Sequence, residues 1–240
     1  HYIKLVGGNT LHLSPCNYNN GVNADFSGCG GGAIYVKLGE VKLYSSVLMN
    51  NNAFNPGGGI YQQDGNVRLV NSLIVSNTAN YGAGVYTCKG QLHVNNSTIS
   101  KNIATRAGGG MDIRYQTAII KNSNISHNIA QGYIAGGIRL YGNSAANPTS
   151  LILEDSIIEN NYCYSNIGGL PGGDGGGGIQ VQYKVDVVIR RTSFISNRAS
   201  NGNGNDIFIY EESDASGSPL LLLSNVYIAN PNNIYDPGSY

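Results

Sequence analysis

The sequence predicts an all-β chain wound as a parallel β-helix, on three observations. A segment repeats at a fixed period, a short alternating apolar pattern recurs within it, and no stretch sustains the apolar spacing of a helix. Residues 58–128 give the repeat three times, each copy opening on glycines and an apolar residue and closing on asparagine. The opening residues Ile60, Val85 and Met111 are 25 and 26 residues apart. Such a period indicates a solenoid, whose repeats bury an apolar face only when they stack.

The pattern inside the repeat reads apolar-x-apolar-x-x-Ser-x-apolar-x-x-Asn. In Val67-Arg68-Leu69 the first and third positions alternate with a long polar residue, a period of two that indicates strands with one face inward. The sixth position is small, and we interpret it as an inward side chain at a bend. Copies begin at Val41, Val67, Leu92, Ala118, Leu151 and Val187, and at Leu221 without the asparagine. The eighth positions are apolar throughout: Leu48, Ile74, Ile99, Ile125, Ile158, Phe194 and Ile228.

The closing asparagines and the glycine runs predict tight corners between strands. Asparagine tolerates the left-handed conformation that a sharp corner needs, and its amide can bond the asparagine one coil above and below. The glycine runs before Ile60 and Met111 serve a similar purpose, since only glycine takes positive φ without strain. We interpret both features as architectural. Coils stacked roughly 4.8 Å apart would then align like residues in ladders along the axis.

Two tetrapeptides resemble a known family. Gly31-Gly32-Ala33-Ile34 and Phe194-Ile195-Ser196-Asn197 match the GGA[ILV] and FxxN motifs of polymorphic outer-membrane protein repeats. The other glycine runs lack the full GGAI form, and Leu or Ile fills the Phe position of the other copies. The resemblance implies a right-handed parallel β-helix of the autotransporter-passenger type, displayed outside the cell and used in adhesion.

The whole chain, 1–240, is expected to form a single β-helix domain of about eight coils. Residues 1–33 are expected to form an imperfect first coil in which 11–18 copies the pattern, 34–230 the regular coils, and 231–240 an irregular tail. Insertions break the period in three places, at about 141–149, 162–177 and 211–219. The first and last of these leave from the same corner, and insertions in repeat proteins are where function is usually placed.

The amino-acid composition restricts the classes of partner that the chain can bind. Charged residues make up 12% of the chain and the formal net charge is zero, so the basic footprint of a nucleic-acid-binding protein is missing. No apolar run approaches 18 residues, so we expect no membrane span. The polar surface is built from Asn, Ser, Gly and 17 Tyr, which suits carbohydrate contact or self-association. No C-x-x-C motif or histidine cluster occurs, and we expect no metal and no cofactor.

Cysteines and sequons give further candidate modification sites. Cys16 and Cys29 are 13 residues apart, close to half a coil, and are predicted to bridge the first coil. Asn95 and Asn124 head N-x-[ST] sequons and are the predicted glycosylation acceptors if the source is a secreted eukaryotic protein. The chain begins at His1 without a signal segment, from which we expect a processed product or a fragment.

Outward positions of the glycine-led strands are predicted to stack into two columns. The first column is Tyr35, Tyr61, Tyr86, Asp112, Arg139, Gln180 and Phe208. The second column is Lys37, Gln63, Cys88, Arg114, Tyr141, Gln182 and Tyr210. Adjacent coils would place Asp112 beside Arg139 and Arg114 beside Tyr141. We interpret this group as an exposed ion pair with cross-strand aromatic packing. The predicted binding face consists of Tyr35, Tyr61, Tyr86, Phe208 and Tyr210.

Two functions are compatible with these features. The first is an extracellular, non-enzymatic structural or adhesive protein. It would contact a glycan or cell-surface receptor, and its strand edges, without a capping helix, would stack end to end on copies of itself or on further coils of a longer chain. The second is a polysaccharide lyase or glycoside hydrolase using Asp112, Arg114, Arg139 and Tyr141. A glycosidase needs two carboxylates and Asp112 has no partner acid on its face, so we favour the first.

Overall fold

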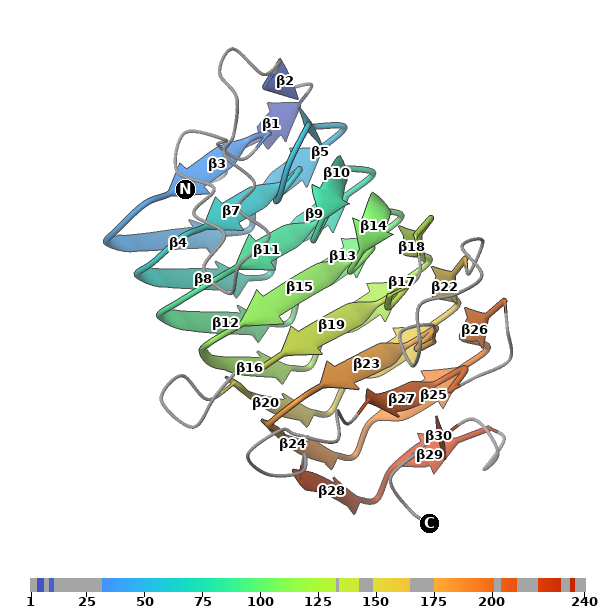
Figure 1. Ribbon diagram of the computed structural model, residues 1–240. Helices are drawn as coiled ribbons and strands as arrows, with labels where there is room; N and C mark the ends of the chain where they lie inside the picture. Colours follow the sequence, from blue (N-terminus) through green and yellow to red (C-terminus); the bar gives the residue numbers. More distant parts are fainter. Residues whose placement is uncertain are drawn as a thin grey trace.

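The computed structural model describes residues 4–6, 9–10, 32–132, 134–142, 149–164, 175–200, 204–210, 220–229 and 234–235. These residues form β-strands joined by turns, with no helix among them, and the strands stack into four parallel sheets (Figure 1). The chain passes through one strand of each sheet per coil, so the fold is the predicted right-handed parallel β-helix, wound in the usual sense of parallel crossovers. The longest sheets have eight strands, in agreement with about eight coils.

Each sheet is named here by its place in the coil. Sheet 1 contains the glycine-led strands β3 (Ile34–Val36), β7 (Ile60–Gln62), β11 (Val85–Thr87), β15 (Met111–Arg114), β19 (Ile138–Tyr141), β23 (Ile179–Gln182), β27 (Ile207–Tyr210) and β30 (Ile234–Tyr235). Sheet 2 contains β4 (Glu40–Tyr44), β8 (Asn66–Val70), β12 (Gln91–Asn95), β16 (Thr117–Lys121), β20 (Thr149–Glu154), β24 (Val185–Arg190) and β28 (Leu220–Ser224).

The other two sheets complete the coil. Sheet 3 contains β1 (Lys4–Val6), β5 (Val47–Met49), β9 (Leu73–Val75), β13 (Thr98–Ser100), β17 (Asn124–Ser126), β21 (Ile157–Glu159), β25 (Ser193–Ile195) and β29 (Tyr227–Ile228). Sheet 4 contains β2 (Asn9–Thr10), β6 (Asn52–Ala53), β10 (Thr78–Tyr81), β14 (Ile103–Ala107), β18 (Ile129–Ala130), β22 (Tyr162–Cys163) and β26 (Arg198–Ala199).

One apolar core fills the hollow of the coil stack. Ile74, Ile99 and Ile125 pair in register across β9, β13 and β17, and none of the three is accessible to solvent. The alternating residues of sheet 2 supply another wall of the core, for example Leu69 and Val94. The predicted inward strand faces are therefore confirmed. Burial of these aliphatic ladders is the main term that stabilises the fold, at roughly 25 cal/mol per Å² of apolar surface removed from water.

The small sixth-position residues also point inward, as predicted. Ser46, Ser72, Ser97, Ser123, Ser156 and Thr192 are all buried. The hydroxyl of Ser97 donates to the carbonyl of Asn95 at 2.9 Å, and its Oγ accepts a hydrogen bond from the backbone of Ser72 at 3.0 Å. A hydroxyl at this bend thus satisfies backbone groups in its own coil and in the preceding one, which explains why a small polar residue recurs at an inward position.

The corners differ from the prediction in one respect. The closing asparagines do not take the left-handed conformation; the residue before each one does, for example Ser76 with φ of 55° and Lys101 with φ of 55°. The asparagine instead turns its side chain into the stack, where Nδ2 of Asn77 donates to Oδ1 of Asn102 at 3.0 Å. The predicted amide ladder is therefore confirmed, and the ladder rather than corner geometry explains why asparagine recurs.

The glycines that precede the strands of sheet 1 allow close contact between coils. Gly82 has a φ of 50°, in the left-handed region that glycine adopts without strain. At Gly84 a Cβ atom would lie 2.6 Å from the carbonyl oxygen of Gly110 in the next coil, a distance that excludes any side chain. At Gly84, glycine is therefore required by the close stacking of the coils and not by its conformational freedom.

The two ends of the stack refine the predicted coil boundaries. In the first coil, β1 and β2 pair with β5 and β6, so residues 4–6 and 9–10 supply sheets 3 and 4. The pattern copy predicted at 11–18 lies outside the described residues. At the other end the tail is not wholly irregular, because Ile234 and Tyr235 form β30 and pair with Ile207 and Phe208.

The three predicted insertions fall between strands, as the period requires. Residues 143–148 lie between β19 and β20, and residues 211–219 lie between β27 and β28, both at the corner from sheet 1 to sheet 2. Residues 165–174 lie between β22 and β23, at the corner from sheet 4 to sheet 1. These insertions themselves lie outside the described residues. Among the described residues, no helix is long and apolar enough to cross a membrane.

Candidate functional site

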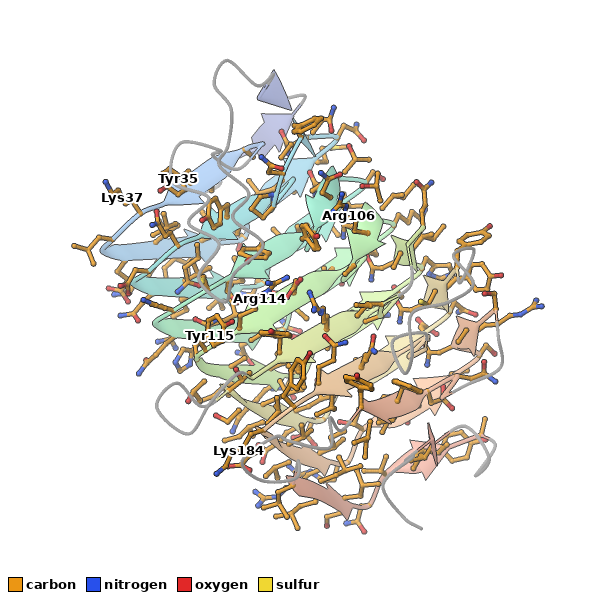
Figure 2. The ribbon with its side chains drawn as sticks, in the orientation of Figure 1. Tyr35, Lys37, Arg106, Arg114, Tyr115 and Lys184 are labelled. Carbon is orange, nitrogen blue, oxygen red and sulfur yellow. The ribbon has the colours of Figure 1, made fainter. Side chains whose placement is uncertain are left out.

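Sheet 1 brings the predicted outward columns together in register. In β15 and β19, Asp112 pairs with Arg139 and Arg114 with Tyr141, so the predicted neighbours are confirmed. Tyr86 lies opposite Asp112, one coil earlier. Figure 2 shows Arg114 and Tyr115 together where β15 ends. The middle of sheet 1 therefore gathers charged and aromatic side chains from successive coils.

Most of the predicted binding face is buried rather than exposed. Tyr61 and Tyr86 are each 1% exposed and Phe208 is 2% exposed, whereas Tyr35 and Tyr210 are partly exposed. Large side chains on neighbouring coils cover one another: the rings of Tyr35 and Tyr61 stack at 5.1 Å, and those of Tyr61 and Tyr86 meet edge to face at 5.4 Å. This column is aromatic packing on the outer side of the sheet, and the prediction that all five residues form an open face is wrong.

Asp112 is the centre of a buried ionic cluster. Its side chain is inaccessible to solvent. Nε and Nη2 of Arg114 donate to its two carboxylate oxygens at 2.9 and 2.8 Å, and Nη1 of Arg139 donates to Oδ2 at 3.2 Å. Arg139 is anchored from its other side, since its Nε and Nη2 donate to Oε1 of Gln182 at 2.9 and 2.6 Å. The predicted exposed ion pair is therefore a buried cluster of two cations and one anion.

Aromatic rings surround the Arg114 guanidinium. Its Cζ lies 5.1 Å from the ring centroid of Tyr86, 5.2 Å from that of Tyr141 and 5.5 Å from that of Tyr81. Cations placed over aromatic faces are attracted to the ring quadrupole, more strongly where water is excluded. Tyr81 comes from β10 of sheet 4, outside the recurring pattern, and no sequence signal placed it here.

The cluster shifts the ionisation of its members. Burial opposes the charge of Asp112, but the coulombic effects of Arg114 and Arg139 outweigh it and hold the pKa of this carboxyl below its usual value. Burial likewise opposes the charge of Arg114, but Asp112 raises the pKa of the guanidinium. Burial raises the pKa of the Tyr86 hydroxyl and of the Cys88 thiol, with Arg114 opposing both shifts. Near neutral pH Asp112 and Arg114 are therefore charged and the Tyr86 hydroxyl is neutral.

A second aromatic row lies at the corner between sheets 1 and 2. The ring centroids of Tyr115 and Tyr141 are 5.8 Å apart, those of Tyr141 and Tyr183 are 5.1 Å apart, and those of Tyr183 and Tyr210 are 5.8 Å apart. All four side chains are partly exposed. We call these four residues the corner tyrosine row. Sequence reasoning missed it, although each tyrosine ends or directly follows a glycine-led strand, which is a signal that a register argument could use.

The ionic cluster is poorly arranged for acid–base catalysis. Asp112 is the one acid among the described outward residues of sheet 1, and both of its oxygens accept hydrogen bonds from arginine. Its lowered pKa also makes it a weak base. What remains accessible is cationic and aromatic: the Arg114 side chain is 14% exposed and lies beside the partly exposed Tyr141. This arrangement suits binding of an anion more than proton transfer.

The remaining predicted sites are separate from this cluster. Asn95 is exposed on β12, whereas Asn124 donates through Nδ2 to Oε1 of Glu159 at 2.9 Å, so Asn95 is the more accessible glycosylation candidate. Cys16 and Cys29, the predicted disulfide, lie outside the described residues. No group of three or more His, Cys, Asp or Glu residues in the described part of the chain is placed to hold a metal ion.

Comparisons with known proteins identified no relative of this chain. No protein-family model, no curated protein and no solved structure matches the chain. The likeness to polymorphic outer-membrane protein repeats therefore consists of the short motifs alone, and the chemistry of the described residues is the basis for assigning a function.

Proposed function

We propose that the protein is an extracellular, non-enzymatic structural or adhesive β-helix whose last coil is covered by another β-layer. The assembly part of this proposal rests on an inward-facing apolar side chain that is exposed to solvent at the end of the stack. Leu223 in β28 pairs with Ile189 in β24, one coil earlier, and both occupy the same inward position. Ile189 is inaccessible to solvent, but Leu223 is 41% exposed.

The strand edge at the same end supports docking there. The outward residues of this coil are also exposed: Leu222 is 50% exposed and Tyr227 in β29 is 60% exposed. In sheet 2, β28 has a single neighbour among the described strands, so the backbone donors and acceptors on its other edge face the end of the stack. In β4, at the other end of the described part of sheet 2, the equivalent inward residue, Leu43, is buried. An apolar layer beside an open strand edge favours the addition of a strand layer, from a second copy or from further coils of a longer chain.

The ionic cluster supports a non-enzymatic role. Asp112 is enclosed by two arginines, and a hydrolase would need a second carboxylate several ångströms away. Incubation with polyuronic acids is therefore expected to leave their chain length unchanged. Cleavage that disappears in Arg139→Ala would instead establish the alternative, a polysaccharide lyase or glycoside hydrolase acting through Asp112, Arg114, Arg139 and Tyr141.

Assembly is tested by sedimentation of the purified chain over a range of concentrations. The wild type is expected to show a mass that grows with concentration, and Leu223→Lys to remain monomeric because a charge cannot be buried at the junction. Ile157→Lys is the matched control: Ile157 is 40% exposed but lies in the middle of the stack, on β21. A wild type that stays monomeric at every concentration would contradict stacking on a second copy and would leave further coils of a longer chain as the covering layer.

A further inference from the structure

The side chain of Arg114 has hydrogen-bonding capacity that the described protein does not use. A guanidinium carries five N–H donors. In Arg114, Nε and one N–H of Nη2 bind Asp112, and no other hydrogen bond from this side chain is made within the described part of the chain. The side chain is nevertheless held firmly, because both bonds to Asp112 are short and three tyrosine rings pack around it. The side chain of Arg114 is 14% exposed to solvent.

The charge of the ionic cluster is also incompletely balanced. Arg114 and Arg139 share the single carboxylate of Asp112, so these three side chains carry a net charge of one positive unit. A largely buried charge without a counter-charge is costly, and an anion reaching Arg114 would relieve that cost. Because the guanidinium is already oriented and partly desolvated, such an anion would bind with little further loss of conformational entropy.

The surface beside Arg114 is aromatic and repetitive. Tyr141 contacts the guanidinium and also belongs to the corner tyrosine row. The Tyr141 hydroxyl makes no hydrogen bond with any described residue, and its ring is partly exposed. The row extends along the coil axis with ring centroids 5.1 to 5.8 Å apart. Partly exposed tyrosine rings offer an apolar platform along this row.

We propose that Arg114 and the corner tyrosine row form a binding site for an acidic polysaccharide, with a carboxylate or sulfate group on Arg114 and sugar rings against Tyr115 and Tyr141. The inference deepens the adhesive role of the proposed function and rests on it. A planar carboxylate matches the fork of a guanidinium, and the apolar faces of sugars pack on tyrosine. A nucleic acid would need a wide basic surface, which a chain of zero net charge with 12% charged residues does not provide.

Cys88 offers a way to occupy the site without disturbing the ionic cluster. It follows Thr87, which pairs with Ile113, so Cys88 lies one coil before Arg114 at the same register position. Its side chain is half-buried. In Cys88→Asp, a new carboxylate beside Arg114 is expected to take up the unused donors and compete with the ligand. Cys88→Ser is the matched control, since it changes the polarity of the same atom without adding charge.

Binding is measured by isothermal titration of the full chain with polygalacturonate and with the same polymer after reduction of its carboxyl groups to alcohols. Dextran sulfate and dextran form the second pair and distinguish sulfate from carboxylate recognition. The charged member of at least one pair is expected to bind and the neutral member to bind at least about tenfold more weakly, the loss expected for a charge-assisted hydrogen bond. Arg114→Gln and Cys88→Asp should each weaken that binding about tenfold or more.

Two control variants keep the outcome decisive. Cys88→Ser and Arg191→Gln should bind like the wild type; Arg191 forms an exposed ion pair with Asp155 on another face. Should Arg114→Gln fail to fold by circular dichroism, Cys88→Asp and Tyr115→Ala decide the question, because both leave the Asp112 bonds intact. Equal binding of charged and neutral polymers, or binding unaffected by Cys88→Asp and Tyr115→Ala, would overturn the proposal. Sedimentation measures assembly independently of polysaccharide binding. A negative result for the Arg114 site can therefore be distinguished from a negative result for the proposed function.

Discussion

Nδ2 of Asn197 donates a hydrogen bond of 2.8 Å to Oδ1 of Asp206, so the asparagine ladder ends on a carboxylate. In every earlier step, Nδ2 of one asparagine donates to Oδ1 of the asparagine in the next coil. The members are Asn51, Asn77, Asn102, Asn128, Asn161 and Asn197. The amide dipoles are therefore aligned along the axis, and their N–H end faces the carboxyl group of Asp206. Aligned hydrogen bonds in a low-dielectric interior polarise one another, so the terminal acceptor affects more than its nearest neighbour.

Replacement of this terminal acceptor should destabilise the whole ladder. Asp206→Leu removes the acceptor of Asn197 and leaves a buried amide N–H unsatisfied, for an expected loss of about 2–4 kcal/mol in the free energy of unfolding. Asp206→Asn keeps an oxygen at the same position and should cost less. The measurement is urea unfolding of the two variants and the wild type. Equal losses in both variants would show that the acceptor oxygen is not what matters.

The middle of the ladder should be the most sensitive position. The amide of Asn128 donates to the carbonyl of Ile99 at 2.9 Å and to Oδ1 of Asn161 at 3.0 Å. Its Oδ1 accepts from the backbone and side-chain nitrogens of Asn102, both at 3.0 Å. Asn128→Ala leaves these buried partners unsatisfied, and we expect a loss of roughly 3–5 kcal/mol in the free energy of unfolding.

Asn95→Ala is the control for that substitution. Asn95 is exposed on β12 and accepts one surface hydrogen bond from Asn122. Its removal is expected to change the unfolding free energy by less than about 1 kcal/mol, because water replaces the lost partner. Similar losses in the two variants would mean that the buried ladder contributes nothing special to stability.

The ionic cluster predicts a specific pH dependence. The pKa of Asp112 is lower in the folded chain than its usual value, so its contribution is present above the unfolded carboxyl pKa of about 3.9 and is lost as the pH falls through the folded pKa. Asp112→Asn leaves two buried arginines without their anion. It should cost roughly 3–5 kcal/mol near neutral pH and progressively less at lower pH, as the wild-type carboxyl becomes protonated.

The comparison is made by chemical unfolding of wild type and variant at neutral and at strongly acidic pH. Asp155→Asn serves as control, because Asp155 pairs with Arg191 at the exposed surface and should change stability little at either pH. If the difference between Asp112→Asn and wild type were independent of pH, the charged state of Asp112 would not be the source of its stabilisation.

The repeat in the sequence was sufficient to predict the fold and its register. Because the side chains of a strand alternate and the period is constant, aligning Met111 with Ile138 also aligned Asp112 with Arg139, as the structure has it. Handedness was implied by the family resemblance rather than by the period. Conformation at the corners was less predictable: the asparagine side chain is placed by its hydrogen bonds to the next coil, which favour an ordinary backbone at Asn77 and move positive φ to Ser76.

The candidate site was predictable in position but not in exposure. Register gives the neighbours of Asp112 along the axis, but burial depends on side chains from other sheets and corners. Tyr81 reaches Arg114 from sheet 4, and Tyr115 belongs to a corner outside the recurring pattern. For that reason a face expected to be open, which includes Tyr61 and Tyr86, is buried, and the accessible tyrosines lie beside it at the corner.

Distances between spin labels along one outward column test most directly whether the chain is a stack of coils in this register. Arg68, His93, Ile119, Ile152 and Val188 pair successively across β8, β12, β16, β20 and β24. With native cysteines replaced by serine, labels at 68 and 188 span four coil steps and should be about 19 Å apart, and labels at 68 and 119 about 10 Å apart. Distances that do not increase in proportion to the number of coils would contradict the stacked β-helix on which every proposal above depends.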